Sequence, residues 1–236
     1  MRLSLLLLAL ALAGCSNESV NAPARAPEAR QAPQAPAVAA KPRIVFLGDS
    51  LTAGLGLAGD QSYPALIGKR LTERGYDYEI VNAGVSGDTS AGGLRRLDWS
   101  LEGDVRVLVV ALGANDGLRG LPASEMKKNL AAVLDRATAT NVTVILAGME
   151  APPNNGPDYT REFRAVYGEL ARDYGVRFIP FLLAGVAGDA SLNQGDGIHP
   201  NARGAQVVAD LVWAELEPAL RRPTEQGTQA PKPLSP

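Results

Sequence analysis

The sequence predicts an α/β protein in which helices cover both faces of a five-stranded parallel sheet. Two patterns lead to this fold class. Five short apolar segments rich in β-forming residues recur along the chain, and amphipathic helical patterns separate them. Strands that alternate with helices form parallel sheets buried on both faces, which gives a three-layer α/β/α sandwich. The length of 236 residues fits one such domain with a tail at each end.

The predicted strands are apolar runs that end at glycine, asparagine or proline, which are turn formers. The first run contains Ile44, Val45 and Phe46, and Gly48 follows it. Each run has the length of a strand and is too short for a core helix. We place the five strands at residues 43–47, 78–82, 106–112, 143–147 and 176–179.

The predicted helices lie between these strands and after the last one. Apolar residues recur in them three and four positions apart, as expected of a helix with one buried face. We expect Ser124 to cap one helix, Gly175 to end another, and Pro200 to stand in the first turn of the last. The helices are expected at residues 62–74, 94–101, 124–140, 158–174 and 200–221.

The composition argues against several classes of protein. A net charge of −2 without a basic stripe argues against a nucleic-acid partner. The chain has one cysteine and one histidine, whereas transition-metal sites usually draw on several such residues. We therefore expect no metal and no other cofactor. Any chemistry that needs an imidazole must use His199.

The first residues resemble a bacterial lipoprotein signal. Residues 3–12 form an apolar run too short to span a bilayer, and it leads into Leu12-Ala13-Gly14-Cys15. This ending resembles a lipobox, in which the cysteine becomes lipid-modified and anchors the protein to the membrane. Ser16 then favours the outer membrane of the cell envelope, facing the periplasm. The alternative is an ordinary signal peptide with a chance cysteine.

The composition also suggests how the chain is divided. The segment before the first strand is rich in Ala and Pro, which is typical of an extended tether, and the last segment is similar. We expect a signal peptide at residues 1–14, a tether at 15–42, a folded domain at 43–221 and a disordered tail at 222–236.

Three of the predicted strands end in loops that carry groups suited to acyl transfer. Ser50 can attack a carbonyl, the backbone N–H of Gly87 can approach a ligand closely, and Asn115 offers an amide donor. The carboxyl ends of parallel strands lie at one edge of the sheet, where open α/β proteins place their reactive groups. The simpler interpretation is that Asp49 and Ser50 only cap a helix.

Asp196 and His199 lie three positions apart in a glycine-containing loop before the last predicted helix. This spacing allows the carboxylate to reach one nitrogen of the imidazole and fix its tautomer. The other nitrogen can then take a proton from a serine. The simpler interpretation of a lone histidine is a surface or capping residue.

Four blocks, in this order, resemble the GDSL or SGNH hydrolase family. They are Gly48-Asp49-Ser50-Leu51, Gly87, Gly113-Ala114-Asn115-Asp116 and Asp196-Gly197-Ile198-His199-Pro200. The chain is most similar to the bacterial thioesterase I, lysophospholipase and arylesterase group. The similarity extends over about residues 43–220.

The resemblance implies a flavodoxin-like sheet and a serine hydrolase that needs no cofactor. In this family pattern Ser50 is the nucleophile, His199 the general base and acid, and Asp196 the group that orients His199. The oxyanion hole comprises the backbone N–H groups of Ser50 and Gly87 and the side chain of Asn115.

The same resemblance leads us to expect structural roles for two acids beside these residues. We expect Asp49 and Asp116 to hold their loops by hydrogen bonds. The implied substrates are acyl esters: lysophospholipids, aryl esters or esters of short to medium acyl chains, and thioesters are included as candidates. We expect a monomer.

Three other functions need to be weighed against this one. Gly54-Leu55-Gly56-Leu57-Ala58-Gly59 matches a dinucleotide-binding string, but its first glycine does not end the strand, and Asn82 rather than an acid ends the second strand. We expect these glycines to let the backbone pass close to an acyl pocket. The remaining alternatives are a carbohydrate O-acetyl esterase of the envelope and a non-catalytic binding lipoprotein.

Overall fold

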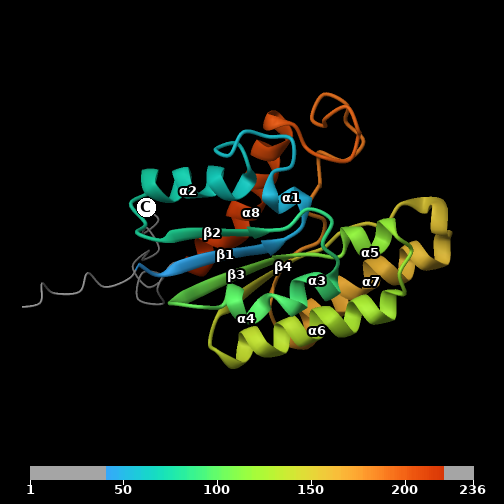
Figure 1. Cartoon of the computed structure of the whole chain (residues 1–236), viewed down its shortest axis with the longest axis horizontal. Helices are drawn as coiled ribbons and strands as arrows, with labels where there is room; N and C mark the ends of the chain where they lie inside the picture. Colours follow the sequence, from blue (N-terminus) through green and yellow to red (C-terminus); the bar gives the residue numbers. More distant parts are fainter. Residues whose placement is uncertain (1–40, 221–236) are drawn as a thin grey trace, which may run out of the picture. The chain divides into compact units, whose positions relative to one another are not determined.

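The computed structural model describes residues 41–220, so the predicted signal peptide, Cys15, most of the tether and the tail lie outside the described residues. Five parallel strands form one sheet in the order β2-β1-β3-β4-β5, which is the flavodoxin-like order (Figure 1). All five predicted strands are confirmed. They are β1 Arg43–Gly48, β2 Glu79–Gly84, β3 Val105–Ala111, β4 Thr143–Ala147 and β5 Arg177–Ile179.

Helices cover both faces of this sheet. In Figure 1, α2 and α8 lie above it, and α3, α4, α6 and α7 lie below it. The helices are α1 Ser50–Ala53, α2 Tyr63–Glu73, α3 Ser90–Arg95, α4 Leu97–Ser100, α5 Ala114–Leu118, α6 Ala123–Ala139, α7 Pro157–Tyr174 and α8 Ala202–Leu220, with a 3-10 turn at Pro153–Asn155. No helix within residues 41–220 has the length and apolar character of a membrane span.

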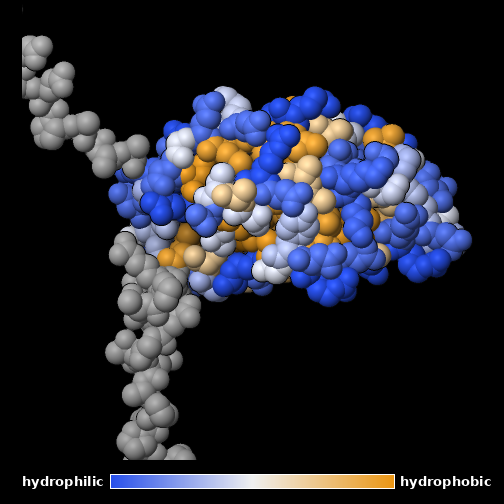
Figure 2. Space-filling view, turned by 90° about the horizontal axis from the view of Figure 1, so that it is seen from below, coloured by the Kyte–Doolittle hydropathy of each residue, from blue (hydrophilic) through white to orange (hydrophobic). Residues whose placement is uncertain are grey.

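The core lies between the two helical layers and the central strands. Four consecutive residues of β1, from Ile44 to Leu47, are fully buried, and so are Leu108, Val109 and Val110 of β3. Strands that are buried on both faces consist of continuous apolar runs, and such runs made these strands easy to predict from the sequence. Figure 2 shows the face seen from below, where hydrophilic residues cover much of the surface and hydrophobic residues are visible between them.

Two predicted helix starts are wrong. The sixth helix begins at Ala123, its cap residue is Pro122, and the Ser124 side chain caps nothing. The last helix begins at Ala202, after Pro200 rather than with it. The Asn201 side chain caps this helix instead, because its oxygen accepts hydrogen bonds from the backbone N–H groups of Arg203 and Gly204.

The single helix predicted at 94–101 is wrong, because α3 begins earlier, at Ser90, and ends at Arg95, and α4 follows as a separate short helix after Arg96. The guanidinium of Arg96 donates to the carboxylate of Asp88 at 2.7 Å and to the Gly48 carbonyl at 2.7 Å, and it also bonds the Ala83 carbonyl. One side chain thus ties together the ends of β1 and β2 and the loop that follows β2. This brace fixes the edge of the sheet at which the predicted site residues lie.

Candidate active site

Ser50 is the first residue of α1, which begins as β1 ends at the carboxyl edge of the sheet. Asp49 caps this helix, because its carboxylate accepts a hydrogen bond from the Leu51 N–H at 3.0 Å. The capping interpretation is therefore correct for Asp49. It does not account for Ser50, whose Oγ lies 2.9 Å from Nε2 of His199.

The turn from Asp196 to His199 places the one imidazole of the chain against this serine. One oxygen of Asp196 accepts the backbone N–H groups of Ile198 and His199, both at 3.0 Å, and the other lies 2.6 Å from Nδ1 of His199. We assign the imidazole proton to Nδ1, because the carboxylate is an acceptor there. Nε2 is then free to accept the hydroxyl proton of Ser50.

These contacts determine the charge of Asp196. The hydrogen bond from His199 and, next, the two backbone N–H bonds lower the pKa of Asp196 to about 2. The carboxylate therefore stays ionised across the neutral and mildly acidic range. A fixed negative charge beside Nδ1 favours the imidazolium that forms when Nε2 takes a proton.

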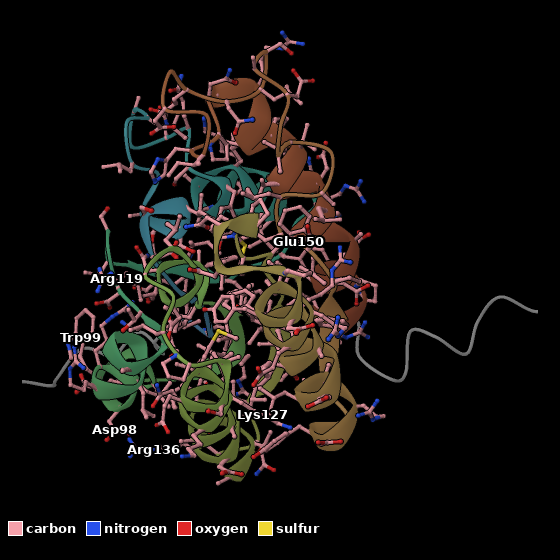
Figure 3. All side chains as sticks on the ribbon, turned by 90° about the vertical axis from the view of Figure 1, so that its right-hand side faces the viewer. Asp98, Trp99, Arg119, Lys127, Arg136 and Glu150 are labelled. Carbon is pink, nitrogen blue, oxygen red and sulfur yellow. The ribbon has the colours of Figure 1, made fainter. Side chains whose placement is uncertain are left out.

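The other two predicted donors come from the ends of β2 and β3. Gly87 lies in the turn after β2 with φ +83°, a left-handed conformation that glycine adopts without strain. Asn115 belongs to α5, and its Nδ2 donates to the Asp88 carbonyl at 2.9 Å, which joins the two loops. Arg119, just after α5, donates to the Gly87 carbonyl at 2.7 Å. Figure 3 looks onto this edge and labels Arg119 and, from the segment after β4, Glu150.

A cavity of about 260 Å³ opens beside Ser50. Ser50, Asn115 and His199 all line it, whereas Gly87 stands outside its lining in the adjoining loop. The rest of the wall is mainly apolar. Its larger apolar side chains are Leu51, Leu118, Met149, Pro152, Phe181, Leu183 and Ile198. Such a cavity suits a chain of methylene groups better than a sugar.

The model of the GDSL-like lipase/acylhydrolase family matches residues 46–207 of this sequence. This chain belongs to that family. Esterase TesA from Pseudomonas aeruginosa is 44% identical over 77% of this chain and 91% of its own length. Thioesterase 1/protease 1/lysophospholipase L1 from Escherichia coli K12 is 35% identical over 77% and 86%. A crystal structure of TesA, at 44% identity, matches with a TM-score of 0.72 and covers 76% of this chain and 100% of that chain.

In this GDSL-like hydrolase Asp116 holds its loop by hydrogen bonds, as expected. The Asp116 carboxylate accepts the Ser90 N–H at 2.7 Å and the Ser90 hydroxyl at 2.6 Å. Asn129 of α6 donates to the same hydroxyl at 3.0 Å. Asp116 is 2% exposed, so this network anchors α5 to the start of α3 inside the protein.

Burial disfavours the ionised form of the other buried acid, Asp49. Burial raises the pKa of Asp49 to about 6, although the bonds from Leu51 and Asn115 and the nearby His199 act in the opposite direction. The folded chain therefore keeps a proton on Asp49 at pH values where the unfolded chain has lost it. The contribution of Asp49 to stability is greatest below its ordinary pKa of 3.8 and is lost as the pH rises through about 6.

The glycine string at residues 54–59 has a structural explanation in this hydrolase. Gly54 ends α1 in the left-handed conformation. Gly56 faces Gln194, and a side chain at this position would collide with the Gln194 amide. That amide donates to the Leu55 carbonyl at 2.7 Å, while the Gln194 backbone N–H donates to the His199 carbonyl at 2.7 Å. The string thus lets one loop pack against the loop that carries the histidine.

Several residues that shape the site were not predicted. Arg96 and Arg119 brace its loops, and Met149, Phe181 and Leu183 form its apolar wall. The position of the wall had a signal in the sequence, since residues just after the fourth and fifth strands must lie at the carboxyl edge. Among the described residues, no group of three or more His, Cys, Asp or Glu side chains is arranged to hold a metal ion.

Proposed function

We propose that this protein is a serine esterase that hydrolyses acyl esters through an acyl-serine intermediate. The observation that carries the proposal is the chain of two short contacts, 2.9 Å from Ser50 Oγ to His199 Nε2 and 2.6 Å from His199 Nδ1 to Asp196. A hydroxyl, an imidazole and a carboxylate in this order form the relay of serine hydrolases. The chain's membership of the GDSL-like family supports the same conclusion.

In the acylation step, Ser50 Oγ bonds to the carbonyl carbon of the ester while Nε2 of His199 takes the hydroxyl proton. The carbonyl oxygen becomes an oxyanion. The N–H groups of Ser50 and Gly87 and the amide of Asn115 are the donors that stabilise it. The bond from carbon to the alcohol oxygen then breaks, and the departing alcohol takes the proton from His199, which leaves the acyl group on Ser50.

Deacylation repeats the sequence with water. His199 takes a proton from the water as its oxygen bonds to the acyl carbon, and the same donors face the second oxyanion. The bond to Ser50 Oγ breaks, Oγ regains the proton from His199, and a carboxylic acid leaves. Asp196 stays ionised throughout and favours the imidazolium in both steps.

The apolar cavity points to acyl chains of short to medium length. Its volume of about 260 Å³ lies just below the range typical of pockets for drug-sized ligands. Lysophospholipids, aryl esters and thioesters carry such chains, and the similar proteins named esterase and thioesterase/lysophospholipase fit this substrate class. The acetyl group of an acetylated sugar would contact little of this apolar wall. A non-catalytic binding protein would not need a serine, a histidine and an aspartate in hydrogen-bond contact.

The test is a substrate panel with a covalent label. The purified protein is expected to hydrolyse p-nitrophenyl butyrate and octanoate, to release fatty acid from lysophosphatidylcholine, and to act weakly on acetylated sugars. A fluorophosphonate probe is expected to add to one site, and peptide mapping should find it on Ser50. Preference for acetylated sugars would favour the envelope O-acetyl esterase. Failure to hydrolyse any ester, with no label, would favour a binding lipoprotein.

We also propose that the protein is anchored in the outer membrane by lipid on Cys15 and works, facing the periplasm, as a monomer. The support lies in the sequence: the apolar run that ends at Cys15, Ser16 after it, and the Ala- and Pro-rich segment at 15–42. Two or more acyl chains on one cysteine suffice for stable attachment. The relay is complete within one chain, so the proposed monomer needs no second copy to form it.

Metabolic labelling tests the anchor. Cells that express the full chain and are fed labelled palmitate should incorporate the label into the wild type and not into the Cys15→Ser variant. Ser16→Asp is the matched variant, which should keep the label and move the protein to the inner membrane fraction. Equal labelling of wild type and Cys15→Ser would refute the anchor.

A further inference from the structure

The mechanism leaves one buried charged group beside the nucleophile without a role in the reaction. Asp49 is 1% exposed and directly precedes Ser50. One of its oxygens accepts the Leu51 N–H, and the other accepts the Asn115 Nδ2 at 3.3 Å. A serine or threonine would also cap α1, so the cap alone does not require a carboxylate.

The second contact determines which end of the Asn115 amide faces its neighbours. Nδ2 also donates to the Asp88 carbonyl at 2.9 Å. Both partners of Nδ2 are acceptors only, so an amide turned by half a rotation would set its oxygen against two other oxygens. The carboxylate of Asp49 and the carbonyl of Asp88 thus hold the amide with its N–H groups on the side where Asp49, Ser50 and Asn115 together line the cavity.

We propose that Asp49 is a positioning residue that holds the Asn115 amide ready to donate to the oxyanion. This inference rests on the proposed esterase function. The bond from Asn115 to Asp49 is the longer of the two, and a long bond is weak. Its hydrogen can therefore be shared with the oxyanion as negative charge develops there, in a three-centre bond, while the bond to Asp88 keeps the side chain in place.

The state of Asp49 fits a role in function rather than in stability. Its burial makes the ionised carboxylate unfavourable, as its raised pKa shows, yet both of its oxygens have donors. A residue that opposes stability but is fully hydrogen-bonded is typical of a functional site. The nearby His199 acts against this effect of burial and lowers the pKa of Asp49.

Two substitutions separate the cap from the contact to Asn115. In Asp49→Asn the side-chain oxygen can still accept from Leu51, but an NH2 group then faces the Asn115 NH2 group. In Asp49→Ser the hydroxyl can cap α1, while nothing reaches Asn115. Both variants are expected to keep KM and to lose kcat by about 10²-fold, as expected when a donor to the transition state is misplaced.

A double-mutant cycle tests whether Asp49 acts through Asn115. Asn115→Ala alone is expected to lose on the order of 10²- to 10³-fold in kcat for p-nitrophenyl butyrate. The Asp49→Asn/Asn115→Ala double variant should be no slower than Asn115→Ala, within about twofold, because the positioned group is already gone. Multiplication of the two losses, or an unchanged kcat in both Asp49 variants, would overturn the proposal.

Asp116→Asn is the matched control, because Asp116 is an equally buried acid that touches Ser90 and not the Asn115 side chain. Any loss in kcat that it causes should multiply with that of Asn115→Ala. Thermal unfolding at pH 7.5 should show Asp49→Asn as stable as the wild type or more so. If the wild type hydrolyses no ester and Ser50 takes no phosphonate, the proposed function has failed; hydrolysis with an additive cycle means that only the role of Asp49 has failed.

Discussion

Replacing Ser50 with alanine is expected to lower kcat for p-nitrophenyl butyrate by about 10⁶-fold, the loss seen when the nucleophile of a serine hydrolase is removed. Within residues 41–220, the only side-chain hydrogen bond of Ser50 joins its Oγ to Nε2 of His199. Because Asp49 caps α1, removal of this hydroxyl breaks no bond that holds the helix. The variant should therefore unfold at the temperature of the wild type and take no fluorophosphonate label.

Ser62→Ala is the control for this substitution. Ser62 is buried and lies at the end of the loop that follows α1, and its Oγ caps α2 by accepting the Ala65 N–H at 3.4 Å. Its replacement should reduce the free energy of unfolding by about 1 kcal/mol and leave kcat close to that of the wild type. Turnover of Ser50→Ala above about one per cent of wild type would mean that another group makes the acyl-enzyme.

Replacing His199 with alanine is expected to lower kcat by a similar factor, about 10⁶-fold, because the serine hydroxyl then has no base. Nucleophile and base act as one unit, so the Ser50→Ala/His199→Ala double variant should be no slower than either single variant. Asp196→Asn should lose less, on the order of 10⁴-fold, since the imidazole stays beside Ser50 and only its tautomer and charge are disturbed.

The single histidine makes this prediction unusually easy to check. A reagent specific for imidazole has one target in the whole sequence. Its addition should abolish hydrolysis in step with the modification of one residue, and a bound phosphonate on Ser50 should slow the modification of His199. A modified protein that still hydrolyses the ester would show that the imidazole is not the base.

Most of the sheet could be predicted from the sequence because its strands are buried on both faces. The apolar runs that mark β1 and β3 need no alternation to be recognised, and their ends fall within one or two residues of the prediction. The short helices α1 and α5 were not predicted. A helix of four or five residues shows less than two turns of periodicity, and its cap alone cannot distinguish it from a turn.

The errors at the two helix starts have one cause. The sequence around Ser124 and around Pro200 offers more than one residue that can begin a helix, and the choice depends on where the preceding loop leaves the chain. Pro200 is held beside Asn193 in a β-bridge, so the helix starts only after Asn201. Local preference could not reveal a contact made across the loop.

The candidate site was predicted more fully than the helix ends. Ser50 lies at the predicted edge because it follows the end of a strand in a parallel sheet. Asp196 and His199 lie in the loop before α8, and their contacts with each other and with Ser50 are those that their spacing predicts. The cavity wall could not be predicted residue by residue. Phe181 and Leu183 reach the cavity because β5 lies beside β4. The order of the strands in the sheet cannot be deduced from any single segment of the sequence.

The direction of β1 has a practical consequence. The described chain enters at Lys41, at the amino end of this strand, whereas Ser50 follows its carboxyl end, six residues or about 20 Å away. A solid support or fusion partner coupled through the amino-terminal side therefore meets the domain at the end remote from the reacting ester. Immobilised in this way, the enzyme should keep its entrance open to dissolved substrates.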